Sequence, residues 1–324
     1  MDMKEIELLS ELVNYRSFSD AAFSLAYSPS VISKYVSNIE KELGVKLFVR
    51  GNKANDLTLT PEGRVLISHI QKLNAEYQRM MEMCKQLKGS FENVLRVGSQ
   101  SRFGNVFERN ILASFLQQNP DAELEILKMS PRDLLKLIQV GKLDAMFISI
   151  HENTNIDNYF GDIYRCGELE LRPLRTEREM YVGISEKYLP GIENEVNFSA
   201  FKDFCFALPF PKSADENDLH MINSFERLAQ ESGFKLKTIY LGTHDHMVLK
   251  LATERPIAVT TTNIPDRYEG VKFLKVSDWS TSANVYLVSL KSNRKKMLIN
   301  LKKSITEFLN RQDRSNNQAE PKPR

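Results

Sequence analysis

The hydrophobic and polar positions of the first sixty residues follow the pattern of two short amphipathic helices joined by a tight turn. Ser17 and Asp20 form a capping-box arrangement that opens the first helix. That helix is expected to bury Ala21, Ala22 and Leu25. Ser28 is a cap for the second helix, and Pro29 takes its first position, where the missing N–H costs nothing. Gly44 ends the second helix, whose apolar residues predict one buried stripe at Ile32, Val36, Ile39 and Leu43.

The other face of the second helix carries small hydroxyls and a long cation, at Ser30, Ser33, Lys34 and Ser37. Such side chains can reach base edges and phosphates when a helix lies in the major groove of DNA. The same pattern is also compatible with an ordinary helical hairpin that has a solvated polar face.

A candidate β-hairpin follows directly. The runs KLFVR and DLTLT alternate like strands, and the turn signal Gly51-Asn52-Lys53 separates them. This hairpin would form a wing in which Arg50 and Lys53 contact DNA phosphates. Residues 1–60 hold seven Lys/Arg and eight Asp/Glu, so attraction to DNA must depend on local placement rather than on net charge.

A long heptad pattern runs from Thr60 to about Lys88. Thr60 is a cap, Pro61 takes the first helical position, and Glu62 suits the positive end of the helix dipole. Apolar residues then recur at alternating steps of four and three, at Leu66, Ile70, Leu73, Tyr77, Met80, Cys84 and Leu87. This seam is typical of a dimeric coiled coil, although a long helix packed on its own domain would also fit. We interpret residues 1–60 as the DNA-binding domain and residues 61–88 as a linker and dimerisation helix of about 40 Å.

Beyond Lys88-Gly89-Ser90 the pattern alternates between strands and helices. Three segments have the pattern of strands: VLRVGS, ELEILKM and DAMFISI. The helices expected between them are NVFERNILASFLQQNP and DLLKLIQVGKL. This alternation predicts a mostly parallel sheet with helices on both faces. A second cluster of strands is expected near 179–184, 204–208, 238–241 and 257–260. The chain is expected to return to the first sheet through the segments KFLKV and ANVYLVSL and the helix KKMLINLKKSITEFLN. The polar tail 311–324 is expected to be disordered.

Over residues 3–309 the chain resembles LysR-type transcriptional regulators. The N-terminal resemblance rests on Ser17, Phe18, Ala21, Ala22, Leu25, Ser33, Leu43, Gly44, Leu47, Phe48, Arg50, Leu59, Thr60 and Gly63. In the second half the matching residues are Leu95, Arg96, Gly98, Phe115, Pro120, Leu135, Gly141, Leu143, Asp144, Pro173, Leu174, Phe225 and Gly233.

The resemblance implies an α/β multi-domain fold. Its parts would be a winged helix-turn-helix, a long linker helix and a two-lobed α/β effector domain that resembles periplasmic binding proteins. The effector domain would span residues 92–309, with lobe I at 92–164 and 267–309 and lobe II at 165–266. Hinges would lie near Arg165 and Asp266. The resemblance also implies a homodimer or homotetramer, with RNA polymerase as a further partner.

A ligand in such a fold lies between the lobes, near strand ends and helix N-termini. Ser99, Gln100 and Ser101 end the first strand, and Ser130-Pro131 opens a helix. Their hydroxyls and N–H groups suit a carboxylate or another polar anion, although Ser130 would serve equally well as a simple cap. The resemblance adds Ser149, Phe210 and Thr243 to the site. Because position 149 is not an arginine, the resemblance does not fix an acid as the effector.

Composition excludes several other classes of protein. The formal charge of +2 is too small to indicate a membrane or nucleic-acid partner by itself, and no apolar run is long enough to span a bilayer. Cys84, Cys166 and Cys205 are too far apart for a disulfide framework, which suits a reducing cytoplasm. A redox role for these cysteines, or a metal site at His244-Asp245-His246, remains a minor alternative. We expect no cofactor and no metal.

The sequence therefore predicts a cytoplasmic, non-enzymatic transcriptional regulator that binds double-stranded DNA and responds to a small-molecule effector. Two other classes stay open. One is an architectural DNA-binding protein with a vestigial pocket, and the other is a ligand-binding receptor or metabolic enzyme that uses the α/β lobes.

Overall fold

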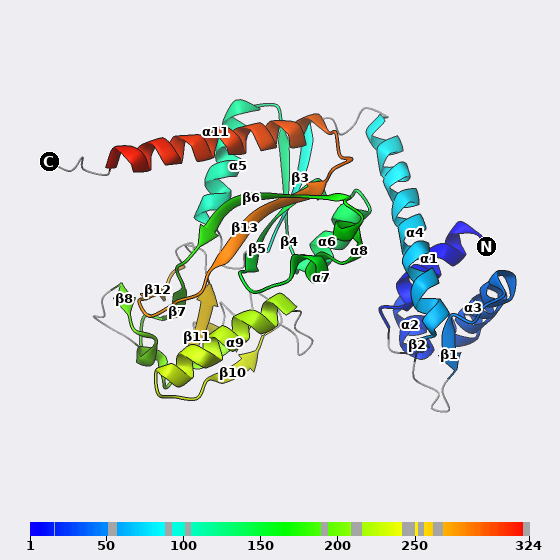
Figure 1. Cartoon of the computed structure of the whole chain (residues 1–324), viewed down its shortest axis with the longest axis horizontal. Coiled ribbons are helices and arrows are strands. Elements are labelled where there is room, and N and C mark those ends of the chain that lie inside the picture. The colour runs from blue at the N-terminus through cyan, green and yellow to red at the C-terminus, as the bar shows by residue number, and fades with distance from the viewer. Residues whose placement is uncertain are drawn as a thin grey trace. The chain divides into compact units, whose positions relative to one another are not determined.

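The chain divides into an N-terminal unit, Met1–Ser90 with Gln139–Lys142, and a larger unit of Phe91–Ile138 and Leu143–Arg324. Figure 1 shows the chain coloured from its N-terminus to its C-terminus in the computed structural model. The described residues are 1–15, 17–50, 57–87, 93–100, 105–188, 194–208, 216–241, 250–251, 256–261 and 268–319.

The N-terminal unit is a helical domain with a small β-hairpin. Its elements are α1 (Met3–Leu12), α2 (Phe18–Leu25), α3 (Pro29–Leu43), β1 (Phe48–Arg50), β2 (Leu57–Leu59) and α4 (Pro61–Leu87). Ser17 caps α2 by accepting the Asp20 N–H, and Ser28 caps α3 by accepting the Val31 N–H. Strands β1 and β2 pair antiparallel, which confirms the predicted hairpin. Its turn, Gly51-Asn52-Lys53, lies outside the described residues.

The core of this unit follows the predicted stripe with one exception. Ile32, Val36 and Ile39 are buried together with residues of α1 and α4. Leu43 keeps 36% of its surface exposed, so the prediction that it is buried was wrong. The helix ends at Gly44, which adopts a left-handed φ of 71°. Beyond Gly44 the chain returns to the same core at Leu47, which is fully buried.

Helix α4 is joined to the hairpin by a close backbone approach at Gly63. The Thr60 hydroxyl donates to the Lys46 carbonyl over 2.6 Å, and the Gly63 N–H donates to the Thr60 hydroxyl over 2.8 Å. A Cβ atom at position 63 would lie 2.1 Å from the Leu47 carbonyl oxygen, so only glycine fits there.

The larger unit contains two lobes, each built on one sheet. Lobe I has the strand order β4-β3-β5-β13-β6. Its strands are β3 (Val94–Ser99), β4 (Glu123–Lys128), β5 (Ala145–His151), β6 (Leu169–Glu177) and β13 (Ala283–Leu290). Strands β4, β3 and β5 are parallel to one another, whereas β13 runs antiparallel to both β5 and β6.

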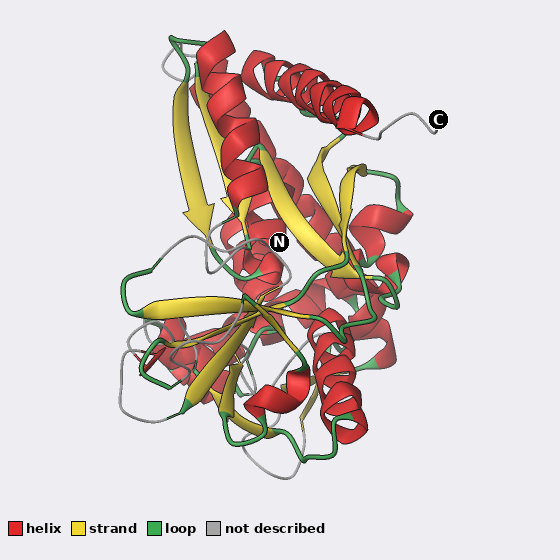
Figure 2. Ribbon diagram, turned by 90° about the vertical axis from the view of Figure 1, so that its left-hand side faces the viewer, coloured by secondary structure: helices red, strands yellow, loops and turns green. Residues whose placement is uncertain are grey.

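Helices cover both faces of the lobe I sheet (Figure 2). One face packs against α5 (Val106–Gln118) and α11 (Lys296–Ala319). The opposite face packs against α6 (Pro131–Gln139), α7 (Ile156–Phe160) and α8 (Asp162–Arg165). The two faces bury separate apolar clusters, as a sheet covered on both sides requires.

Lobe II has the strand order β10-β9-β11-β7-β12-β8. Its elements are β7 (Tyr181–Ser185), β8 (Glu195–Val196), η1 (Phe198–Phe201), β9 (Cys205–Leu208), α9 (Glu216–Glu231), β10 (Lys237–Tyr240), β11 (Ile257–Thr261) and β12 (Val271–Val276). The core on one face is rich in aromatic side chains, with Phe198, Phe201, Phe206 and Phe225 all buried.

The crossings between the lobes lie at residues 178–180 and 277–282, not near Arg165 and Asp266 as expected. Strand β6 was missed because ELELRPLRTE is charged and contains Pro173, which an edge strand tolerates. KFLKV was assigned to the wrong sheet, since β12 pairs with β7 in lobe II. Both sheets are mixed. In lobe I, β13 runs antiparallel to β5 and β6, and in lobe II, β7 runs antiparallel to β11 and β12, whereas β12 is parallel to β8.

Helix α11 continues to Ala319, so the expectation of disorder from Arg311 was wrong for residues 311–319. A helix that is already formed extends at little cost for each added residue. Residues 320–324 lie outside the described part of the chain.

Candidate DNA-binding surface and effector site

The predicted reading face of α3 is accessible. Ser30 and Lys34 are exposed, and Ser33 and Ser37 are half-buried beside the core stripe. The Ser28 and Ser30 hydroxyl oxygens lie 3.0 Å apart at the start of the helix. The first turn of α3 contains no acid, so nothing in that turn opposes an approaching phosphate.

Tyr35 lies on a different exposed side of α3 from Ser30 and Lys34. It is 37% exposed, and its ring meets the ring of Tyr27 edge to face at 6.4 Å. The side chain of Arg50 and the whole of Lys53 lie outside the described residues.

Glu40 fixes α3 to the hairpin. Its side chain is 2% exposed and accepts the backbone N–H groups of Leu47 at 2.9 Å and Phe48 at 3.2 Å. The Lys46 ammonium closes the arrangement at 2.7 Å. Burial by itself would raise the pKa of Glu40, but these hydrogen bonds together hold it below its ordinary value. The helix and the wing strand are therefore held in one orientation.

The heptad seam of α4 has two parts. Leu66 and Ile70 pack into the core of their own N-terminal domain. Farther along, Leu73 and Met80 are 54% and 50% exposed, Cys84 is exposed and Tyr77 is half-buried. The side chain of Leu87 lies outside the described residues. Only the second part is open to a partner helix.

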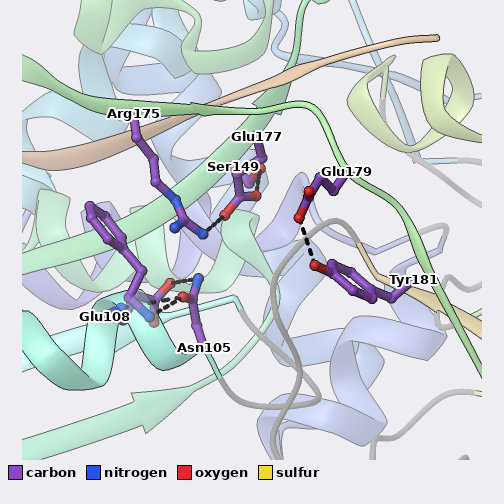
Figure 3. A network of polar contacts seen from close by, with 8 residues as sticks. Asn105, Glu108, Ser149, Arg175, Glu177, Glu179 and Tyr181 are labelled. Atoms are coloured by element: carbon purple, nitrogen blue, oxygen red, sulfur yellow. Dashed lines mark hydrogen bonds and ion pairs between the residues drawn. The ribbon is translucent and has the colours of Figure 1, made fainter. Parts of the chain in front are cut away.

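Three predicted effector residues lie in one buried polar cluster of lobe I, and Figure 3 shows one of them, Ser149, with the acids of the cluster. Ser99 ends β3, and its hydroxyl lies 2.6 Å from a carboxylate oxygen of Glu108 on α5. Ser149 of β5 donates to Glu177 over 3.3 Å. Gln100 donates through Nε2 to the Ser149 carbonyl over 3.0 Å.

The acidic members of this cluster are almost fully buried. Glu108 is 7% exposed and Glu177 is 5% exposed. Burial, with a smaller contribution from the charge of Glu177, raises the pKa of Glu108 to about 7, and the hydrogen bond from Ser99 opposes this shift. The Asn105 side chain caps α5 through the Phe107 and Glu108 N–H groups, and its Nδ2 reaches Glu108 at 3.2 Å.

Arg175 supplies the balancing cation. Its guanidinium donates to Glu177 and lies 4.2 Å from the centre of the Phe107 ring. Nearby, Tyr181 at the start of lobe II donates to Glu179 over 2.6 Å (Figure 3). Lys275 pairs with Glu179 at 2.8 Å. Burial and the bond to Glu179 raise the pKa of Tyr181, so its hydroxyl stays protonated.

The remaining predicted effector residues do not join this cluster within the described part of the chain. Ser130 is exposed and exchanges hydrogen bonds with Asp133, so it acts as the cap of α6. Ser101, Phe210 and Thr243 lie outside the described residues, as does His244-Asp245-His246. No group of three metal-binding side chains occurs among the residues that are described. Burial raises the pKa of the Cys205 thiol, which disfavours a reactive thiolate there.

A second polar contact joins the lobes at His151. This residue ends β5 in lobe I, is 2% exposed, and stacks its ring on His220 of α9 at 5.8 Å. The Asn153 N–H donates to His151 Nδ1, so the proton of the neutral ring must sit on Nε2. That Nε2–H group faces the Ser224 hydroxyl at 3.1 Å, and Ser224 donates to the His220 carbonyl at 3.0 Å.

We expect this contact to weaken as pH falls below 6.5. Burial lowers the pKa of His151; Glu152 opposes the shift, and His220 and Arg227 reinforce it. A folded-state pKa below the unfolded value means that the stabilisation is present at higher pH and is lost on acidification. Trp279 reports on the contact, because its ring packs on Phe225 of α9 at 5.4 Å.

Urea unfolding followed by Trp279 fluorescence should therefore show a midpoint that decreases with acidification. His151→Gln should flatten this profile, and His69→Gln, at an exposed position of α4, should leave it unchanged. If the urea midpoint of His151→Gln depended on pH as steeply as that of the wild type, His151 would not be the group that makes the contact sensitive to pH.

The fold combines a helical unit that carries a small β-hairpin with a larger half built from two α/β lobes. Two family models match the chain. "Bacterial regulatory helix-turn-helix protein, lysR family" covers residues 3–64, and "LysR substrate binding domain" covers residues 88–300. The chain belongs to the LysR family of transcriptional regulators. Among the described residues, no helix is long and apolar enough to cross a membrane.

The similar proteins are regulators from several bacteria. The HTH-type transcriptional regulator BenM of Acinetobacter baylyi is 26% identical over 147 residues, which are 45% of this chain and 47% of BenM. The HTH-type transcriptional activator TtdR of Escherichia coli K12 is 26% identical over 48% of each chain. The matches thus span about half the length of these curated relatives.

A solved structure shares the whole fold. The crystal structure of CbnR, a LysR family transcriptional regulator, matches with a TM-score of 0.53 at 14% identity. The match covers 95% of this chain and 99% of CbnR. At this level of identity the likeness confirms the predicted fold, and the effector remains to be argued from the residues of this chain.

Proposed function

We propose that the protein is a sequence-specific DNA-binding transcriptional regulator controlled by a small-molecule effector bound between the two α/β lobes. The observation that carries this proposal is the exposed polar start of α3, held against the hairpin by the buried Glu40. A reading helix must present donors to base edges in a fixed orientation, and Ser30, Ser33, Lys34 and Ser37 fit that role. Arg50 and Lys53 would hold the DNA backbone.

The protein acts as a dimer or a dimer of dimers in this proposal. The exposed apolar residues Leu73 and Met80 support pairing of α4 helices, because large exposed apolar side chains on one seam mark an interaction surface. Pairing sets the distance between two reading heads and hence between two half-sites. Cys84, which lies on the same seam, is a small packing residue in this arrangement.

Effector binding at the Ser99, Gln100 and Ser149 cluster would change the relative angle of the lobes and, through it, the spacing of the reading heads. The protein is not an enzyme in this proposal. It works in the cytoplasm, with RNA polymerase as a partner at the promoter.

Lys34→Ala should weaken binding to the protein's own promoter DNA by about tenfold, since a lost base or phosphate contact costs on the order of 1–3 kcal/mol. Footprinting and titration of full-length protein on that DNA provide the measurement. Lys4→Ala removes the same charge from an exposed position of α1 and should have little effect. A footprint limited to one short half-site, or equal losses in the two variants, would contradict the proposal.

A further inference from the structure

A cavity of about 300 Å³ lies on lobe I between the edge strand β6 and the first half of α11. Among the described residues, its lining holds five cationic side chains and one acid: Glu170, Arg172, Lys291, Arg294, Lys302 and Lys303. Five positive charges against one negative charge give this lining a formal charge of +4, whereas the whole chain carries +2. Positive charge is therefore concentrated at this cavity.

Two of the five cations are held in place by contacts between β6 and α11. The Arg172 guanidinium donates to the Thr306 hydroxyl over 2.6 Å, and that hydroxyl donates to the Lys302 carbonyl over 2.9 Å. The Lys302 ammonium is 18% exposed and pairs with Glu170 at 2.8 Å. Because Thr306 is neutral and Glu170 pairs with Lys302, the charge of Arg172 is not compensated, and its guanidinium has further N–H donors.

The other three cations lack an acidic partner. Within the described part of the chain, no carboxylate pairs with Lys291, Arg294 or Lys303. Lys291 and Arg294 lie in the turn between β13 and α11, and α11 begins at Lys296, so the positive end of the helix dipole adds to the same field. Like charges gathered around one concave surface repel one another, and a bound anion would remove this repulsion.

The charge and the size of the cavity select a small multivalent anion. A single carboxylate would neutralise one positive charge and leave the others in excess. Linked phosphate groups carry several negative charges, and their oxygens accept strong hydrogen bonds from Arg and Lys. A volume of about 300 Å³ is that of a small-molecule site. Ile299 also lines the cavity and is 41% exposed, so it offers an apolar surface to an organic part of the ligand.

We infer that this cavity is a second ligand site, which binds a small molecule with two or more linked phosphate groups. The cavity lies at the end of β6 where Leu169 pairs with Leu290 of β13. Glu177, which belongs to the polar cluster of the proposed effector site, pairs with Ala283 at the opposite end. Arg172 and Glu177 are about 15 Å apart along the strand, at roughly 3.3 Å per residue. The second site therefore goes beyond the proposed function and does not depend on it.

Calorimetric titration of the full-length protein with inorganic pyrophosphate and with ADP is the direct test. Acetate at the same ionic strength is the control for a monovalent carboxylate, and the buffer contains no phosphate and no divalent metal ion. Saturable binding of either phosphate compound, without binding of acetate, supports the inference. Tighter binding of ADP identifies a nucleotide as the ligand, and tighter binding of pyrophosphate identifies the phosphate groups alone. No saturable binding of either compound, or equal binding of acetate, overturns the inference.

Two double variants with the same net charge locate the bound compound. Arg294→Gln/Lys303→Gln removes two cations of the cavity and should weaken binding by about tenfold or more, because two charge-assisted hydrogen bonds are lost. Arg132→Gln/Lys235→Gln removes the same charge from exposed positions outside the cavity and should leave the affinity unchanged. Equal losses in the two double variants would mean that the anion responds to the overall charge of the protein, and the inference would be wrong.

Thermal unfolding of the same variant distinguishes a ligand site from a structural role of these cations. Without ligand, Arg294→Gln/Lys303→Gln should unfold at a temperature no lower than that of the wild type, because the substitutions reduce repulsion between like charges. With saturating pyrophosphate, the unfolding temperature of the wild type should rise, and that of the variant should rise less. A lower unfolding temperature of the ligand-free variant would mean that the two cations stabilise the fold itself, which contradicts a site that needs an anion.

Discussion

Asp144→Ala is expected to destabilise lobe I by about 3–5 kcal/mol, because it leaves the charge of Lys295 buried without a partner. The two side chains are 3% and 6% exposed and lie 2.9 Å apart. Asp144 also accepts the Arg96 N–H at 2.8 Å and a weaker bond from Asn293 at 3.4 Å. One carboxylate thus joins β3 to the segment that leads into α11.

Hydrogen exchange measured along the chain tests this prediction. Amides of β3, β5 and the first turns of α11 should exchange faster in Asp144→Ala, whereas the N-terminal unit should keep its protection. The double variant Asp144→Ala/Lys295→Met should recover part of the loss, since no unpaired charge remains. Glu307→Ala breaks an exposed ion pair with Arg311 and should cost about 0–1 kcal/mol. If Asp144→Ala lowered the stability of lobe I no more than Glu307→Ala does, the prediction of a buried charge without a partner would be refuted.

Local signals predicted the N-terminal unit well. Caps at Ser17 and Ser28 and the left-handed Gly44 act within a few residues of the helices that they limit, so a single sequence contains the information. A strand end placed Ser99 in the predicted effector site, and the family resemblance alone placed Ser149 there; their role in effector binding remains a prediction. The dimer seam and the DNA contacts remain predictions.

The buried acids escaped sequence reasoning for a physical reason. Glu108 lies on α5, and Glu177 and Arg175 lie on β6, so only the folded sheet brings them together. In the sequence these residues look like solvated charges on polar segments. Once β6 is an edge strand beside β13, the same charges turn inward.

Glu40 shows the same limit in the N-terminal unit, because its partners Lys46, Leu47 and Phe48 lie at the entry to β1 rather than on its own helix. Glu40→Ala should lower the free energy of unfolding of this unit by about 2–4 kcal/mol, since the buried N–H groups of Leu47 and Phe48 lose their acceptor. DNA binding should fall with it, because the orientation of α3 relative to the hairpin is no longer fixed. Chemical denaturation followed by circular dichroism, together with DNA titration, measures both effects.

Glu40→Gln separates the hydrogen bonds from the charge. Glutamine keeps an acceptor for the two N–H groups and loses only the ion pair with Lys46, which is 68% exposed and therefore contributes about 0–1 kcal/mol. The pKa of Glu40 is below its ordinary value of 4.5, so the charge stabilises the fold above that pH and ceases to do so as pH falls below it. The difference in the free energy of unfolding between wild type and Glu40→Gln should therefore disappear on acidification. The lower free energy of unfolding of Glu40→Ala should persist, because a protonated glutamate in the wild type still accepts the backbone N–H groups. If Glu40→Gln were as unstable as Glu40→Ala at neutral pH, charge rather than backbone hydrogen bonding would hold the reading helix against the wing.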